Sequence, residues 1–314
     1  MPSCPMTTAN PQVILYAQHG WADDRSKVAA LATSVAEPGT LVIAPSLGYI
    51  KTWLRIEPLI QAVEQLVIET DRQHPNVPIR VVGHSMGGLI WLEVLNRHPE
   101  WWSRIESIVL VASPVGGADL ARALDPFNWG IGIARDLGVN RHRLAEAIAA
   151  KIPMLVVAGD IDGGSDGTIT VESTKVFGAE FVCLPGLPHP ILANHPKVAA
   201  AIRQFWQLVP DRPLAPRQTV DISYKIIQRL QSVPGMTDAH YRDFPHAKVY
   251  LTFDNGMTIR TWTNPMGVDH VFVACPQGSC LYSGFVGWLH TNDLRQSLQE
   301  MQSEYQPLLV ITRQ

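Results

Sequence analysis

Residues 79–97 constrain the fold of this chain most strongly, because they place a glycine-rich turn between a short apolar run and a helical pattern. The strand-like run 79–82 reads IRVV, the turn reads GHSMG with Ser85 at its centre, and after Gly88 the helix-like LIWLEVLNRHP follows. Glycines two residues before and two after the serine remove the Cβ atoms that would clash in a sharp turn. This order of strand, G-x-S-x-G and helix predicts a serine exposed at the tip of a strained turn.

Strand-like and helix-like segments alternate between residues 12 and 208. Six short runs rich in valine, isoleucine and leucine are predicted strands: 13–17, 41–44, 79–82, 108–111, 154–158 and 181–184. Continuous apolar strands of this kind are typical of a parallel sheet covered by helices on both faces. Helical spacing of apolar residues predicts helices at 56–70 and 144–152. The alternation therefore predicts an α/β doubly wound fold.

The chain changes character after residue 208. Segment 208–219 holds three prolines and no periodicity, which predicts a semi-rigid linker. Beyond it, helices are predicted from residue 222 and over 292–305. Strands are predicted at 247–253, 257–262, 270–275 and 280–286, with a hairpin turn at Asn255-Gly256. We therefore expect two domains, 1–210 and 211–314, the second a small α+β unit of unknown role.

Composition excludes several classes of function. The net charge is -3 without a long run of either sign, so no nucleic-acid partner is expected. The N-terminus lacks a basic, apolar leader, and no apolar stretch is long enough for a membrane span, so a cytoplasmic protein is expected. The four cysteines have no framework spacing, and Cys275 and Cys280, which would lie opposite each other in a hairpin, are predicted to be free thiols. The sequence contains no CxxC or HExxH motif, so no metal site is expected.

The GHSMGG turn resembles that of the α/β-hydrolase superfamily, and within it the lipase/esterase branch. The resemblance covers about residues 12–208, and the residues after 215 resemble no known family. It implies an α/β-hydrolase fold with a mostly parallel sheet and a short lid, in which 1–210 is the catalytic domain. It also implies that Ser85 is the nucleophile.

The segment Gln18-His19-Gly20-Trp21 is similar to the HG-x oxyanion loop of this superfamily. The resemblance implies an oxyanion hole made by the backbone N–H groups of Trp21 and Met86. Gly20 would let the backbone approach the substrate, and His19 is expected to pack under the loop rather than transfer protons.

Chain order in the superfamily implies an acid and then a histidine after the nucleophile. Three aspartates, Asp160, Asp162 and Asp166, lie in the loop GDIDGGSDGTITVES. Asp166 is the expected acid, because Asp-Gly-Thr-Ile-Thr is similar to the Asp-Gly-x-Val-Pro element of lipases and esterases. Asp162 remains the alternative, and Asp160 is expected to be structural.

The histidine is expected in the loop PGLPHPILANHPKV, which follows the last predicted strand. His189 lies a few residues after the strand, where the catalytic histidine of the superfamily usually lies. His195 precedes Pro196 and is expected at the start of a helix.

The superfamily places a lid after the segment Ser113-Pro114, and we expect it at about 114–152. Its apolar Phe127 and Trp129, together with Trp53, are predicted substrate-binding residues. The expected reaction is hydrolysis of a small-molecule or lipid carboxylic ester with a hydrophobic acyl group, without metal or organic cofactor. The alternatives are an acyltransferase or thioesterase with the same triad, or a non-catalytic protein that binds a hydrophobic ligand. Nothing in the sequence predicts the oligomeric state.

Overall fold

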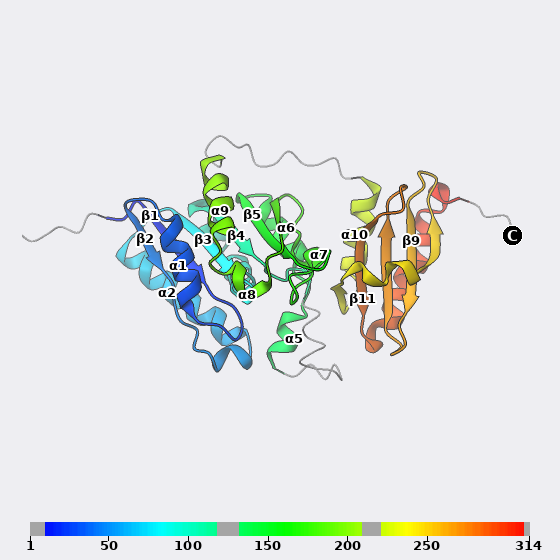
Figure 1. Ribbon diagram of the computed structural model, residues 1–314, viewed down its shortest axis with the longest axis horizontal. Helices are drawn as coiled ribbons and strands as arrows, with labels where there is room; N and C mark the ends of the chain where they lie inside the picture. Colours follow the sequence, from blue (N-terminus) through cyan, green and yellow to red (C-terminus); the bar gives the residue numbers. More distant parts are fainter. Residues whose placement is uncertain (1–9, 118–131, 209–220, 311–314) are drawn as a thin grey trace, which may run out of the picture.

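The computed structural model describes residues 10–117, 132–208 and 221–310. These residues form two separate β-sheets, each with its own helices (Figure 1). The larger sheet comes from the part of the chain before residue 208, and the smaller sheet from the part after 221. The expected fold class, an α/β sheet followed by a small α+β unit, is confirmed.

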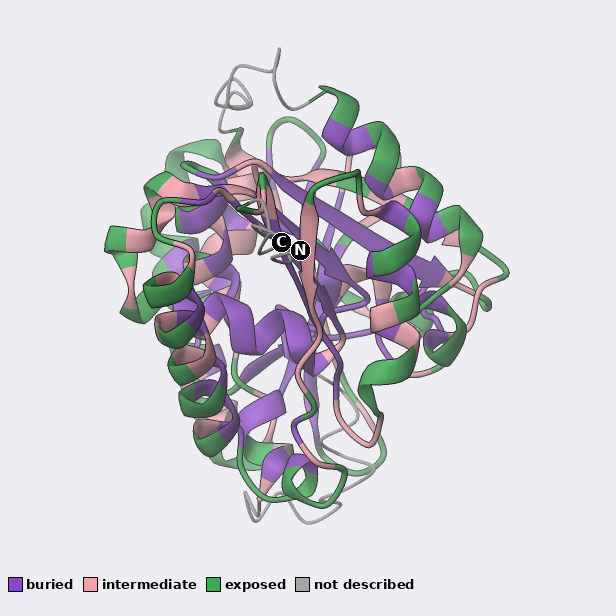
Figure 2. Cartoon of the chain, turned by 90° about the vertical axis from the view of Figure 1, so that its left-hand side faces the viewer, coloured by how far each residue is buried: buried purple, intermediate pink, exposed green. Residues whose placement is uncertain are grey.

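The larger sheet contains six strands in the order β2-β1-β3-β4-β5-β6, and every neighbouring pair is parallel. They are β1 (Val13–Gln18), β2 (Thr40–Ile43), β3 (Ile79–His84), β4 (Ile105–Val111), β5 (Met154–Asp160) and β6 (Glu180–Pro185). All six predicted strands are present. The four central ones are largely buried (Figure 2). Burial on both faces was the wrong expectation for the two edge strands. β2 is half-buried throughout, and in β6 half-buried and exposed residues alternate.

Helices cover both faces of this sheet (Figures 1 and 2). The helices are α1 (Arg25–Val35), α2 (Glu57–Gln73), α3 (Met86–Arg97), α5 (Ile133–Leu137), α6 (His142–Ala149), α7 (Val171–Thr174), α8 (His189–Leu192) and α9 (Pro196–Leu208), with short 3₁₀ turns η1 (Lys51–Trp53) and η2 (Pro99–Arg104). One apolar core joins α2, α3 and α6 to the sheet, and a second joins α1 and α9 to it. The two predicted helices in this region correspond to α2 and α6.

The smaller sheet is antiparallel and has the order β7-β11-β10-β9-β8. Its elements are α10 (Ile222–Gln231), β7 (Met236–Asp238), η4 (Tyr241–His246), β8 (Lys248–Thr252), β9 (Thr258–Thr263), β10 (Asp269–Ala274), β11 (Cys280–Val286), η5 (Trp288–His290), α11 (Thr291–Glu304) and η6 (Gln306–Leu308). Both helices share one apolar core with the strands. The sequence did not predict β7, a strand of only three residues. We call residues 221–310 the C-terminal unit.

The predicted hairpin turn at Asn255-Gly256 joins β8 to β9. Gly256 alone takes a left-handed conformation, with φ of +85°. The Asn255 side chain instead accepts a hydrogen bond from the backbone of Met257 at 3.0 Å. A glycine is needed here because residues with a Cβ atom rarely adopt this conformation.

The hairpin between β10 and β11 keeps Cys275 and Cys280 as free thiols. A bulge in β11, where Leu281 has no partner, makes Ala274, rather than Cys275, the Cα partner of Cys280. The expectation that the two cysteines lie directly opposite each other was therefore wrong, because the extra residue shifts the register.

Several predictions fall on segments outside the described residues. These are the linker within 209–220 and the part of the predicted lid that carries Phe127 and Trp129. The division into domains at 210 stays a prediction. Among the helices of residues 10–117, 132–208 and 221–310, none combines the length and apolar character that a bilayer crossing requires.

Candidate active site

Ser85 lies on a sharp turn between β3 and α3. Its backbone has φ of 55° and ψ of -127°, a strained conformation for a residue with a side chain. The Ser85 N–H donates to the carbonyl of Val111 at 2.8 Å. A Cβ atom on Gly83 would lie 2.5 Å from Cα of Gly88, so the strand and the helix pack backbone to backbone. The glycines are therefore needed for close packing, as the sequence predicted.

The loop after β1 lies directly on this turn. A Cβ atom on Gly20 would lie 2.7 Å from Ser85 Cβ and 3.2 Å from the backbone nitrogen of Met86. The residue after Gly20 is Trp21, so both predicted oxyanion donors belong to segments that meet at the serine. Met86 is the first residue of α3, where unpaired backbone N–H groups and the helix dipole favour an anion.

His19 is fully buried under this loop. Its Nδ1 donates to the carbonyl of Gly20 at 3.0 Å, and its Nε2 accepts from the backbone of Leu47 at 3.0 Å. Burial lowers the pKa of His19 below its usual value, which keeps the ring neutral and preserves this pair of bonds. The expectation that His19 packs under the loop is confirmed.

Asp166 and His189 form a close pair. His189 Nδ1 lies 2.7 Å from Asp166 Oδ2, and both side chains are largely buried. Asp166 Oδ1 accepts from the backbones of Thr168 and Ile169 at 2.9 and 2.6 Å, and the His189 N–H donates to the Asp166 carbonyl at 3.0 Å. Backbone N–H groups thus hold one oxygen of the carboxylate. The other oxygen accepts from His189 Nδ1 and so orients the histidine ring with Nδ1 protonated.

The other two aspartates of this loop make other contacts. Asp160 Oδ1 accepts from three successive backbone N–H groups, at residues 162–164, which is the structural role expected for it. Asp162 accepts from the backbone and hydroxyl of Ser165, both at 2.8 Å, and lies 3.4 Å from His240 Nε2 in the C-terminal unit. The structure therefore brings Asp166, and not Asp162, to His189.

His195 lies at the start of α9, where its Nδ1 accepts from the backbone of Lys197 at 3.2 Å. His84, which precedes the serine, is buried, and its Nε2 donates to the His189 carbonyl at 3.3 Å. Burial, and then the neighbouring His189, hold the pKa of His84 well below its usual value. The contact to His189 had no signal in the sequence, because it depends on how the last loop folds over the turn.

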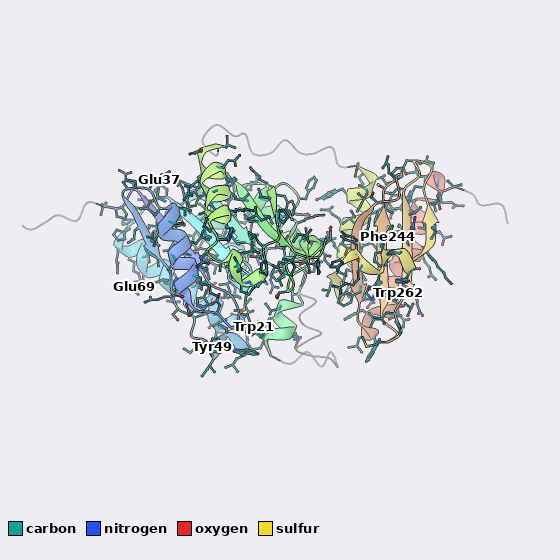
Figure 3. The ribbon with its side chains drawn as sticks, viewed as in Figure 1. Trp21, Glu37, Tyr49, Glu69, Phe244 and Trp262 are labelled. Atoms are coloured by element: carbon teal, nitrogen blue, oxygen red, sulfur yellow. The ribbon has the colours of Figure 1, made fainter. Side chains whose placement is uncertain are left out.

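One cavity of about 220 Å³ contains Ser85 and His189. The residues that line it are Trp21, Ala22, Asp23, Lys27, His84, Ser85, Pro114, Leu137, Thr168, Ile169, His189 and Pro190. Trp53, predicted to line the site, is not among them. Its ring centroid lies 4.5 Å from that of Trp21 and 6.4 Å from that of Tyr49. Figure 3 labels Trp21 and Tyr49. Sequence reasoning missed two charged residues of this lining, Lys27 and Asp23. Asp23 lies just before α1 and Lys27 lies in its first turn, and the two form an ion pair at 3.4 Å.

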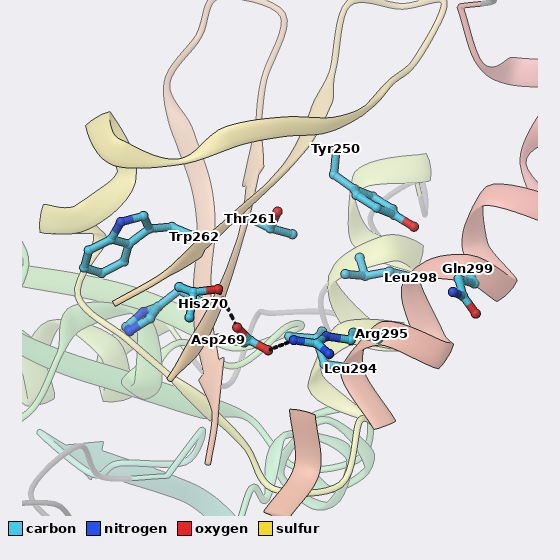
Figure 4. A pocket seen from close by; sticks show the side chains of 10 residues that line it. Tyr250, Thr261, Trp262, Asp269, His270, Leu294, Arg295, Leu298 and Gln299 are labelled. Atoms are coloured by element: carbon cyan, nitrogen blue, oxygen red, sulfur yellow. Dashed lines mark hydrogen bonds and ion pairs between the residues drawn. The ribbon is translucent and has the colours of Figure 1, made fainter. Parts of the chain in front are cut away.

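A second cavity, of about 330 Å³, lies between the small sheet and α11 (Figure 4). Asp269 accepts there from the Thr263 hydroxyl at 2.6 Å and pairs with Arg295 at 3.5 Å. This cavity contains neither Ser85 nor His189. Within the described residues, no group of three or more His, Cys, Asp or Glu side chains is arranged to hold a metal ion.

The four predicted groups all follow strands of the parallel sheet. Gly20 and Trp21 follow β1, Ser85 follows β3, and the loops after β5 and β6 carry Asp166 and His189. The carboxyl ends of parallel strands lie along one edge, which explains why residues so distant in sequence meet. A hydroxyl, a base held by a carboxylate and a pair of N–H groups are the components that acyl transfer requires.

Two sequence matches cover parts of the chain. Residues 9–131 match the family described as Serine aminopeptidase, S33. Lecithin-cholesterol acyltransferase-like 1 from Arabidopsis thaliana is 32% identical over 88 residues, which are 27% of this chain. This match spans 20% of the length of that protein.

Solved structures resemble the chain in fold. Est1E from Butyrivibrio proteoclasticus superposes with a TM-score of 0.50 at 15% identity, covering 66% of this chain and 92% of that one. The structure of Est1E with ferulic acid bound gives a TM-score of 0.50 at 16% identity, covering 66% of this chain and 93% of the other. At these identities the likeness is one of fold.

Proposed function

Since the part of the chain before residue 208 has the α/β-hydrolase fold, we propose that this protein is a serine hydrolase that cleaves carboxylic esters. One observation carries the proposal: His189, which is bonded to the buried Asp166, lines the same cavity as Ser85, and Ser85 stands on a strained turn. In the proposed reaction Ser85 is the nucleophile, His189 the general base, and Asp166 the group that orients the histidine.

The proposed mechanism has two steps. His189 Nε2 takes the proton of the Ser85 hydroxyl while the oxygen attacks the ester carbonyl, and the N–H groups of Trp21 and Met86 stabilise the oxyanion. The leaving alcohol receives the proton from His189, which leaves an acyl ester on Ser85. Water then attacks this ester, gives a proton to His189, and releases the acid as the serine recovers its proton.

The cavity lining supports a hydrophobic acyl group. The lining surface is mostly apolar, and Trp21, Pro114, Leu137, Ile169 and Pro190 contribute to it beside Ser85. The volume of about 220 Å³ lies below the usual range for drug-sized ligands, about 300–1,000 Å³. Within the described residues, this cavity therefore suits a short acyl chain better than a long one.

The alternative of an acyltransferase has one supporting observation, the partial match to the acyltransferase-like plant protein. Both reactions use the same acyl-enzyme and differ in the acceptor. Adding a primary alcohol during ester cleavage distinguishes them: a hydrolase continues to release mainly acid, whereas an acyltransferase forms mainly the new ester.

Ser85→Ala tests the proposal directly. We expect loss of p-nitrophenyl ester hydrolysis by up to about 10⁶-fold in kcat, as when the nucleophile of a serine protease is removed. The variant should also lose labelling by a fluorophosphonate probe. Ser46→Ala is the control, because this exposed serine bonds only weakly to the backbone of Gly48, at 3.4 Å.

A panel of p-nitrophenyl esters of increasing chain length, assayed on the parent, gives the acyl preference. A parent that hydrolyses none of them and is not labelled would favour the non-catalytic binding protein. Retained turnover in Ser85→Ala would show that the mechanism is wrong.

A further inference from the structure

We propose that Asp238, the last residue of β7, is a positioning residue for the candidate active site. It acts by holding two segments of the larger part of the chain, residues 113–117 and α6. The proposal rests on the proposed function, and it gives the C-terminal unit a role in that reaction.

Asp238 is completely buried where the C-terminal unit meets the larger part of the chain. Its Oδ2 accepts from His142 Nε2 of α6 at 2.5 Å, and its Oδ1 accepts from the Tyr282 hydroxyl of β11 at 2.9 Å. Gly116 packs against this carboxylate so closely that a Cβ atom would collide with it. The carboxylate therefore joins both parts of the chain in one bonded group.

The backbone of Asp238 makes a second connection. Its N–H donates to the Gly116 carbonyl at 3.0 Å, and the Gly116 N–H donates to the carbonyl of Ser173 in α7 at 2.8 Å. Two residues before Gly116, Pro114 lines the cavity of Ser85. The wall of the cavity is thus only a few bonds away from β7.

The other end of this segment touches the nucleophile turn. The Ser113 side chain lies against Gly88, where a Cβ atom would come within 2.9 Å of Ser113 Cβ. A shift of residues 113–117 would therefore reach the helix that begins after Ser85. Catalytic groups must be held within about 0.5 Å of productive geometry, so a small shift here has a large effect on rate.

Two residues beyond Asp238, His240 reaches the loop that carries the acid. Its Nε2 lies 3.4 Å from Asp162 Oδ1, and Asp162 holds both the N–H and the hydroxyl of Ser165. Ser165 directly precedes Asp166. Residues 238–240 therefore contact both the segment that carries the cavity-wall residue Pro114 and the loop that carries Asp166.

A buried ion pair suits such a role better than an apolar contact. Removing one partner leaves a buried charge without compensation, so the two parts are bonded in one register only. Apolar side chains of similar size can replace one another at small cost, so apolar packing specifies one arrangement less strictly.

The test compares Asp238→Asn with Asp269→Asn. Asp269 is the matched control, because it is also a buried aspartate of the C-terminal unit but bonds Thr263 and Arg295 of the same unit. Both variants are first shown to be folded by thermal melting. Two quantities are then measured in each: kcat and KM for a p-nitrophenyl ester, and the proton NMR signal of the His189 Nδ1–H, assigned by its loss in His189→Gln.

We expect Asp238→Asn to lower kcat about 10- to 100-fold with little change in KM, the size of effect that a misplaced catalytic group produces. The His189 proton signal should shift or broaden. Asp269→Asn should keep both values at those of the parent, even if it melts earlier. A folded Asp238→Asn with unchanged kcat and an unchanged His189 signal would overturn the proposal.

If Asp238→Asn does not fold, Tyr282→Phe replaces it, since it removes one hydrogen bond to the same carboxylate at nearly constant volume. A smaller change in the same direction supports the proposal, and no change in either quantity overturns it. A parent that neither hydrolyses esters nor reacts with a fluorophosphonate defeats the proposed function instead. The NMR comparison still decides the positioning role in that case.

Discussion

At the scale of single residues, the structure distinguishes three carboxylates that lie within seven positions of one another. Asp160 and Asp162 accept hydrogen bonds from their own loop, whereas Asp166 has one oxygen on the backbone and the other on His189. The difference is one of direction: the loop turns the third side chain inward, where it is 2% exposed. Burial makes the bond to the histidine strong, because little water competes for it.

Asp166→Asn should therefore lose far more activity than Asp162→Asn. An asparagine cannot hold the histidine in the required tautomer, and the loss in kcat can reach about 10⁴-fold, as in a serine protease. Asp162→Asn should have a modest effect, through Ser165 and His240. Measuring kcat/KM of both variants on one p-nitrophenyl ester checks the ranking, and the reverse order would make Asp162 the catalytic acid.

At the scale of elements, most of the structure follows from apolar periodicity. The predicted strand 280–286 coincides with β11, and the predicted helix 292–305 is nearly coextensive with α11. The short strand β7 escaped prediction because three residues hold too little pattern. Its conformation comes from pairing with β11, where Gly284, Phe285 and Val286 are its partners.

A substitution on helix α10 measures how much the stability of the C-terminal unit depends on its own apolar core. Leu230 is fully buried between α10 and the small sheet. Leu230→Ala should lower the free energy of unfolding by about 2–5 kcal/mol, because it leaves a cavity. Lys225→Ala, an exposed position on the same helix, is the control. Urea unfolding followed by circular dichroism measures both, and equal stability of the two variants would argue against this core.

At the scale of the whole molecule, polar contacts join the two parts of the chain. Tyr224 and Gln228 of α10 bond Glu146 of α6 at 3.1 and 2.7 Å, beside the pair between His142 and Asp238. Figure 1 shows α10 and β11 facing α6 and α7 across this boundary. Charged and polar groups of this kind bind the two parts in a way that depends on pH.

His142 should make stability fall as the pH rises. Burial by itself lowers the pKa of His142, but the charge and hydrogen bond of Asp238, together with Glu146 on its own helix and Glu172 on α7, outweigh burial, so the pKa is raised. When the folded-state pKa of a histidine is raised, its protonated form stabilises the folded state. This contribution is fully present below the unfolded pKa of about 6.5, and it is lost as the pH rises through the folded-state pKa. The effect of His142→Asn should thus be larger at about pH 6 than at about pH 9.

The loss at the lower pH can reach about 3–5 kcal/mol, the range for breaking a buried ion pair. Thermal melting at both pH values measures it. His195→Asn serves as control, since that side chain bonds the start of its own helix. A destabilisation of His142→Asn that grows with pH would contradict the assignment of charge.

The sequence alone determined the parallel sheet, the serine turn and the loops that carry Asp166 and His189. Each of these depends on local chemistry: apolar strands rich in valine, isoleucine and leucine, buried on both faces in the centre of the sheet, and glycines where the backbone turns sharply. Gly83 and Gly88 illustrate this, because their close contact leaves no room for a side chain.

Tertiary structure decided what depends on contacts between distant segments. The bond between Asp166 and His189 required the loops after β5 and β6 to fold together. The position of Trp53 beside Trp21 required η1, the turn before α2, to pack on the loop after β1. The pairing of Asp238 with His142 joins residues 96 positions apart. The sequence cannot predict such a pair from periodicity. A single buried hydrogen bond depends on how the two parts of the chain pack, and it leaves no repeating pattern in the sequence.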